Sequence, residues 1–137
     1  IANGKVVSFI KQCIEDWQPE AVFTHHPTDT NDDHIVTSLA TVEAIKGQGV
    51  KEFFYLEAAS ATEWSLQSKR RFLPNTYVSV GKDCIEKKLQ ALDVYRGVSR
   101  PYPHPQCRES YMGLAAFRGA QSGFDFAEAF ECVYRIV

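Results

Sequence analysis

Three histidines and three aspartates lie within one stretch of eleven residues, 24–34, whose sequence is THHPTDTNDDH. Neutral imidazole nitrogens and carboxylate oxygens are ligands that suit a catalytic zinc or a similar divalent ion. His34 is the predicted metal ligand, and the adjacent Asp33 is a predicted catalytic residue that can orient its imidazole. We therefore expect this stretch to supply part of a metal-assisted hydrolase site, with the remaining groups lying outside this chain.

Two alternatives remain open for the same stretch. His26 and Asp29 could form a local three-ligand set with His34 and leave one coordination position for water. Alternatively, Pro27 fixes a turn in which Asp29 accepts a backbone hydrogen bond. Asp33 and His34 would then be a helix cap and a surface histidine.

Further candidate residues lie outside the stretch. His104 stands between two prolines, where a rigid loop can hold an imidazole for acid–base work, as His26 could also do. Asp29, Asn31, Glu63 and Trp64 are candidate substrate-binding residues, because an aromatic face can pack on a sugar ring beside polar groups. A surface position for His104 and a core position for Trp64 are the competing interpretations.

The elements around the stretch predict how it is positioned. An apolar segment, 20–23, precedes it as a buried strand, and 35–45 follows as a helix that Asn31, Asp32 or Asp33 can cap. With a second strand at 53–56 this makes a βαβ unit, whose strands pair in parallel. Loops at the carboxyl ends of such strands are where α/β folds place their ligands.

The remaining pattern completes an α/β domain. Helical spacing covers three further segments, the last of which Gly119 can end, and two more segments have strand character. The helices are expected at 6–17, 83–95 and 110–118, and the strands at 76–80 and 127–137. We expect one domain, 1–137, with a Rossmann-like, mostly parallel, three-layer sandwich that is incomplete on its amino-terminal side.

Composition limits the classes of partner and the cellular compartment that we expect for this chain. A net charge of −2 and a pI near 6.1 give no basic surface for nucleic acid. No apolar run is long enough to cross a bilayer. The four cysteines, at 13, 84, 107 and 132, are scattered and are interpreted as free thiols, so a cytoplasmic location is expected.

Residues 24–34 resemble the second conserved block of the PIG-L/LmbE-like N-acetylglucosaminyl deacetylase family. The similarity continues in the same order along nearly the whole chain, through residues 57–64, 72–75, 87–95, 102–105, 118–119 and 127–130. The resemblance implies a Rossmann-like fold and a divalent metal, usually zinc, that helps to hydrolyse the acetamido group of an N-acetylated sugar or glycoconjugate. His34 matches the ligand that ends this block, and Asp33 matches its neighbouring aspartate.

Two departures from the family pattern affect the expected activity. The family's early H-P-D-D block, which carries two further ligands and the general base, is absent, and Asn31 stands where many members have a histidine. The pattern therefore indicates the carboxyl-terminal portion of a longer enzyme, inactive alone. We expect it to be weakly stable or to pair with another chain, such as a second copy. The rival interpretation is a non-catalytic carbohydrate-binding domain of the same fold.

Overall fold

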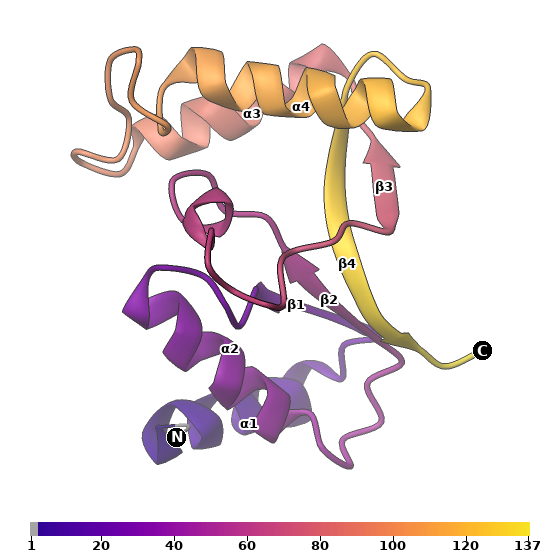
Figure 1. Ribbon diagram of the computed structural model, residues 1–137. Coiled ribbons are helices and arrows are strands. Elements are labelled where there is room, and N and C mark those ends of the chain that lie inside the picture. Colours follow the sequence, from indigo (N-terminus) through magenta and orange to yellow (C-terminus); the bar gives the residue numbers. More distant parts are fainter. Residues whose placement is uncertain (1–2) are drawn as a thin grey trace. The chain divides into compact units, whose positions relative to one another are not determined.

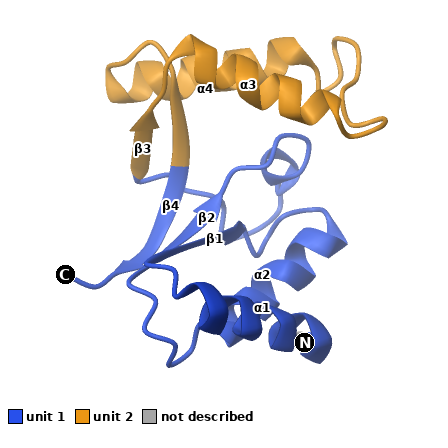
Figure 2. Ribbon diagram, turned by 180° about the vertical axis from the view of Figure 1, so that it is seen from behind, with its two compact units in different colours: residues 1–75, 130–137 blue, residues 76–129 orange. Residues whose placement is uncertain are grey.

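The computed structural model describes residues 3–137 as an α/β protein (Figure 1). The elements in chain order are α1 (Gly4–Trp17), β1 (Ala21–His25), α2 (Asp32–Ala44), β2 (Glu52–Leu56), the 3-10 helix η1 (Thr62–Trp64), β3 (Thr76–Ser79), α3 (Lys82–Asp93), α4 (Arg108–Ser122) and β4 (Ala127–Arg135). Two compact units share them (Figure 2): one runs to residue 75 and includes 130–137, and the other comprises 76–129. The α/β class predicted from the sequence is confirmed.

In the first unit, α1 and α2 pack together against one face of the sheet. Apolar residues three and four apart put Val7, Ile10 and Ile14 of α1 on one stripe, which contributes to the same core as Phe53 and Tyr55 of β2. The side chain of Asn3 accepts a hydrogen bond from the backbone N–H of Lys5 and caps α1. The helix therefore begins three residues before the apolar stripe.

The predicted βαβ unit is confirmed. β1 and β2 are parallel, with Phe23 opposite Phe54 and His25 opposite Leu56, and α2 connects them. β2 lies between β1 and β4 in the sheet order β1-β2-β4-β3. This central position explains why Phe53, Phe54 and Tyr55 are buried in succession, since both faces of the strand are covered.

The sheet is mixed and not mostly parallel as predicted. β4 pairs with β2 in the antiparallel direction, with Arg135 opposite Glu52 and Phe130 opposite Leu56. An irregularity in the pairing lies between Phe53 and Phe54. An apolar–polar pattern identifies a strand but carries no direction, because side chains alternate in the same way in parallel and antiparallel strands. The βαβ pattern therefore predicted the relative direction of the strands only for the β1–β2 pair.

The second unit has its own small core. Ile85 and Leu89 of α3 and Ala115 of α4 are buried together, and Met112 and Phe126 pack against them. α4 runs past Gly119, which was wrongly predicted to end it, and stops at Gly123 with φ of 81°. Gly119 is needed instead for close packing: a Cβ there would lie 2.6 Å from the carbonyl oxygen of Phe124.

Two further findings bear on the molecule as a whole. No helix among residues 3–137 combines the length and the apolar character that a membrane span requires. The single-domain prediction for 1–137 stays a prediction, because a division into two compact units does not show whether either folds alone.

Candidate metal site

The carboxyl end of β1 and the first turn of α2 bring two imidazoles into contact. His25 is the last residue of β1, and His34 lies in the first turn of α2. Their rings are stacked, with centroids 3.7 Å apart and planes 2° from parallel. Asn31 makes this possible, because its Oδ1 accepts hydrogen bonds from the backbone N–H groups of Asp33 and His34 and so starts α2 directly after the loop.

Asp29 adds a buried carboxylate to the pair. Its Oδ2 lies 2.9 Å from Nδ1 of His34, and its Oδ1 accepts a hydrogen bond from the backbone N–H of Asn31 at 3.0 Å. The Asp29 side chain is fully buried, whereas that of His34 is 24% exposed. A buried carboxylate needs charged or hydrogen-bonding partners, so Asp29 fixes the His34 ring while the ring keeps its edge toward solvent.

His25, Asp29 and His34 form a group that could hold a metal ion. One donor atom from each residue lies within 4.8 Å of the other two. Nδ1 of His25 is buried and has no hydrogen-bond partner among the described residues, although buried polar atoms are nearly always paired. Two imidazoles and a carboxylate are a donor set found at catalytic zinc sites, so the residues present fit a divalent cation.

The electrostatics of His25 favour the form that a metal requires. Burial lowers the pKa of His25, and the nearby His34 lowers it further, while Asp29 opposes the shift. An imidazole must be neutral to bind a metal. The site therefore holds His25 in its binding form under conditions in which a solvated histidine is partly protonated.

The structure brings His25, and not His26, together with Asp29 and His34. His26 is fully buried and lies on the other side of the strand, edge-on to Tyr55. Its Nδ1 lies 2.9 Å from Oγ1 of Thr28 and its Nε2 3.5 Å from Glu131. His25 thus replaces His26 in the alternative ligand set of His26, Asp29 and His34. The reason is that successive side chains of a strand point to opposite faces.

The His26 side chain has no solvent-exposed surface in this position. Burial lowers its pKa, with Glu131 acting in the opposite direction. Its fully buried ring and its contact with Thr28 indicate that it anchors the loop 26–31. The predicted catalytic role of His26 has no support in this geometry.

The other predicted site residues take different positions. Asn31 is the cap of α2, so its side-chain oxygen is already used. Asp33 is exposed on the first turn of α2, beside His34 in sequence but outside the three-residue group. His104 belongs to the second unit, where it is exposed and its Nδ1 accepts a hydrogen bond from the backbone N–H of Gln106 at 3.1 Å.

Glu63 and Trp64 lie on η1, in a segment tied to the metal-site loop. Oγ1 of Thr30 donates to the carbonyl oxygen of Ala61 at 3.2 Å, and Oγ of Ser65 donates to Oγ1 of Thr28 at 3.2 Å. Trp64 is 56% exposed, which excludes the core position weighed for it. Glu63 accepts a hydrogen bond from the backbone N–H of Ser60, a residue held at a φ of 73°.

Sequence reasoning missed His25 as a member of the metal group. The available signal was strand alternation: His25 shares a face with Phe23, and His26 shares one with Thr24. That rule separates the two histidines but does not say which faces the start of the next helix. The path of the loop, closed by Asp29 N–H donating to the carbonyl oxygen of His26 at 3.1 Å, decides it.

Comparisons with known proteins show the fold. No known family profile matches the chain, and no curated protein matches it in sequence. The structure is similar to GalB, the 4-carboxy-2-hydroxymuconate hydratase from Pseudomonas putida, with a TM-score of 0.72 and 21% identity over 100% of this chain. It is also similar to the conserved protein TT1542 from Thermus thermophilus, with a TM-score of 0.71 and 19% identity over 98% of this chain. The chain spans 61% of the length of each.

Proposed function

We propose that this chain is part of an enzyme that uses a divalent metal to activate water, and that His25, Asp29 and His34 hold the metal. The observation that carries the proposal is the group itself, with donor atoms within 4.8 Å of one another and a buried nitrogen on His25 that has no hydrogen-bond partner in the described part of the chain. A loop between a strand end and a helix start is the usual place for a ligand in an α/β sheet.

The residues of the chain prepare the site for such an ion. Asp29 holds the ring of His34 through their 2.9 Å contact, and burial lowers the pKa of His25. When bound, a divalent ion would supply Lewis-acid polarisation of a substrate oxygen and a lowered pKa for water. Asp33, exposed on the same turn as His34, is our candidate for the carboxylate that takes a proton from that water.

The substrate that we propose is an N-acetylated sugar or glycoconjugate, whose acetamide bond is hydrolysed. The support is the resemblance of residues 24–34 to the PIG-L/LmbE-like deacetylases, together with an exposed Trp64 on the segment bonded to the same loop. Aromatic faces such as this one suit sugar rings. The acid–base role of His104, which belongs to the second unit, stays a prediction from the sequence.

A second candidate reaction is the addition of water to a carbon–carbon double bond of an unsaturated acid. It is favoured by the structural similarity to GalB, which is a 4-carboxy-2-hydroxymuconate hydratase. Both reactions need an activated water and a polarised substrate oxygen, so the same group of residues could serve either one.

The test compares the two reactions in one preparation. The zinc-loaded chain is offered N-acetylglucosamine conjugates, with amine release measured, and 4-carboxy-2-hydroxymuconate, with the loss of its absorbance measured. Binding of each compound is measured beside turnover, because the groups of the family's H-P-D-D block are absent from this sequence. Amine release that needs zinc and disappears in His34→Gln supports the deacetylase.

The remaining outcomes decide between the alternatives. Zinc-dependent loss of the unsaturated acid without amine release favours the hydratase. Saturable binding of the N-acetylated sugar without any reaction favours the non-catalytic carbohydrate-binding domain. A zinc-loaded chain that neither binds nor converts any of these compounds contradicts the proposed substrates.

A further inference from the structure

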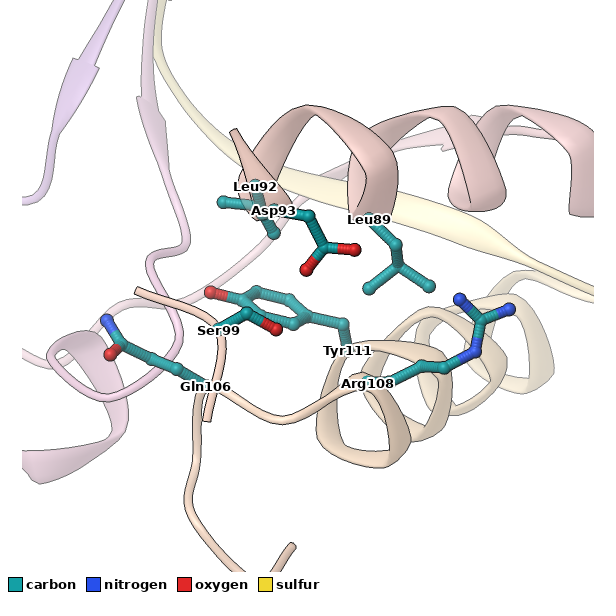
Figure 3. Close-up of a pocket in the computed structure, with 7 residues that line it drawn as sticks. All are labelled: Leu89, Leu92, Asp93, Ser99, Gln106, Arg108 and Tyr111. Carbon is teal, nitrogen blue, oxygen red and sulfur yellow. The ribbon is translucent and has the colours of Figure 1, made fainter. Parts of the chain in front are cut away.

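The second unit contains a pocket that has no part in the metal site. It has a volume of about 170 Å³ and is open to solvent on one side. Its walls come from the end of α3, the start of α4 and the loop between them (Figure 3). The lining residues are Leu89, Leu92, Asp93, Ser99, Gln106, Arg108 and Tyr111.

The pocket combines an apolar floor with two side chains of opposite charge. Leu89 and the ring of Tyr111 supply the apolar part, and both belong to the core of this unit. Figure 3 shows the carboxylate of Asp93 reaching from α3 and the guanidinium of Arg108 rising from α4, with Leu89 between them in this view. A ligand in this space therefore meets a negative and a positive group at separate places.

Arg108 retains hydrogen-bonding capacity. It forms an ion pair with Glu86 of α3. A guanidinium group has five N–H donors in a planar fork, and one carboxylate uses at most two of them well. Asp93 is exposed, and no hydrogen bond or ion pair joins its side chain to another described residue. Its carboxylate is thus available to a cation.

We propose that this pocket binds a small zwitterion, with the chemistry of a free α-amino acid. The ammonium group would bind Asp93, the carboxylate would bind Arg108, and a short aliphatic side chain would lie on Leu89 and Tyr111. Pockets for drug-sized ligands have volumes of roughly 300–1,000 Å³, so a volume of about 170 Å³ selects a much smaller molecule. This inference uses residues of the second unit only and does not depend on the proposed function.

Three variants separate the charged contacts. Asp93→Asn and Arg108→Gln should each weaken binding about tenfold or more, since each removes a charge-assisted hydrogen bond. Glu86→Gln should strengthen binding severalfold, because it frees the Arg108 guanidinium from its present ion pair. As a control, Asp83→Asn removes an exposed carboxylate from the opposite end of α3 and should leave binding unchanged.

The probes are L-valine, L-valinamide, which lacks the carboxylate, and N-acetyl-L-valine, which lacks the ammonium group. Binding to the full chain is followed by the chemical shifts of backbone amides at 89–111, which also report whether each variant is folded. The proposal predicts saturable shifts with L-valine and binding at least tenfold weaker with either derivative. Equal binding of all three probes, no binding of L-valine to the folded chain, or weaker binding in Glu86→Gln would overturn it.

Discussion

The stacked pair of His25 and His34 is the most informative contact at the scale of single residues. Parallel imidazoles 3.7 Å apart cannot both be protonated without strong repulsion, and His34 accordingly lowers the pKa of His25. Asp29, buried beside them, contributes a negative charge that either a protonated histidine or a metal ion would balance. A divalent ion satisfies all three groups at once, including the unpartnered nitrogen of His25.

Removing the charge of Asp29 tests this arrangement. Asp29→Asn should weaken zinc binding about 10-fold to 100-fold, as losses of ligands or of the carboxylates that orient them do at zinc sites. Isothermal titration with zinc on the wild type and the variant measures the change. Asp33→Asn is the matched control, since it removes an exposed carboxylate from the same segment that lies outside the three-residue group. An equal loss in both variants would mean that general negative charge, and not this geometry, attracts the ion.

At the residue scale the sequence indicated the segment of the candidate metal site but not all three residues of the group. The positions of His34 and of the α2 cap follow from local rules. A strand, a short polar loop and the sequence Asn-Asp-Asp together fix where the helix begins. Membership of His25, and not His26, in the three-residue group depends on the path of the loop 26–31 and on the burial of His26 against Tyr55. Such a tertiary contact leaves no trace in local spacing.

At the scale of elements, β1 is one of the two edge strands of the sheet. It lies at one end of the sheet order, and Phe23 on it is 49% exposed although its ring stacks on Phe54 at 4.8 Å. Strands at the edge of a sheet present unpaired backbone groups to other chains. We therefore retain self-association through this strand as a proposal.

A charge on the edge strand should prevent that association. Phe23→Lys is expected to shift the chain toward the monomer in sedimentation velocity runs, because a lysine on an edge strand opposes strand pairing. Phe9→Lys places the same charge on a ring that is 70% exposed on α1 and should leave the sedimentation coefficient unchanged. A wild-type chain that stays monomeric at high concentration would refute the proposal.

β2 gives a prediction for alkaline pH. Burial raises the pKa of Tyr55, and Arg70 opposes the shift. Above the ordinary tyrosine pKa of about 10, the unfolded chain releases this proton while the folded chain keeps it. The folded state then binds more protons, so the free energy of unfolding falls as the pH rises.

Tyr55→Phe should reduce this loss of stability. Urea unfolding of both proteins across the alkaline range measures it, and the slope of stability against pH should be smaller in the variant. Burial also raises the pKa of Tyr134, so part of the slope should remain. Identical slopes would show that Tyr55 is solvated when the chain is folded.

The elements themselves were largely predictable, and the errors have clear causes. The βαβ unit, the helices and the closing strand follow from apolar periodicity, which reports burial directly. The prediction of a mostly parallel sheet was wrong, because periodicity carries no strand direction and β4 runs antiparallel to β2. The end of α4 was wrong because Gly119 serves close packing against 124–125, which only the folded chain reveals.

At the scale of the whole molecule, the chain divides into two units with separate cores. All three proposed metal ligands lie within residues 25–34 of the first unit, whereas Ile85 is buried in the second. Ile85→Ala should cost about 2–5 kcal/mol of stability, the usual range for a buried isoleucine. The number of zinc ions bound by the chain should remain that of the wild type.

Two measurements check this independence. Thermal unfolding reports the loss of stability, and metal analysis after gel filtration, at a temperature where the variant is still folded, reports the zinc content. A folded Ile85→Ala chain that has lost its zinc would contradict a site built from the first unit alone. Ala116→Gly, at an exposed position of α4, serves as a mild control that leaves the core intact.

The most direct test of the metal site is X-ray absorption at the zinc edge of the zinc-loaded chain, compared with His25→Gln. We expect one zinc ion with two imidazole nitrogens and a carboxylate oxygen in its first coordination sphere, and one imidazole fewer in the variant. An unchanged spectrum in His25→Gln, a sphere containing cysteine sulfur, or a chain that binds no zinc would contradict it.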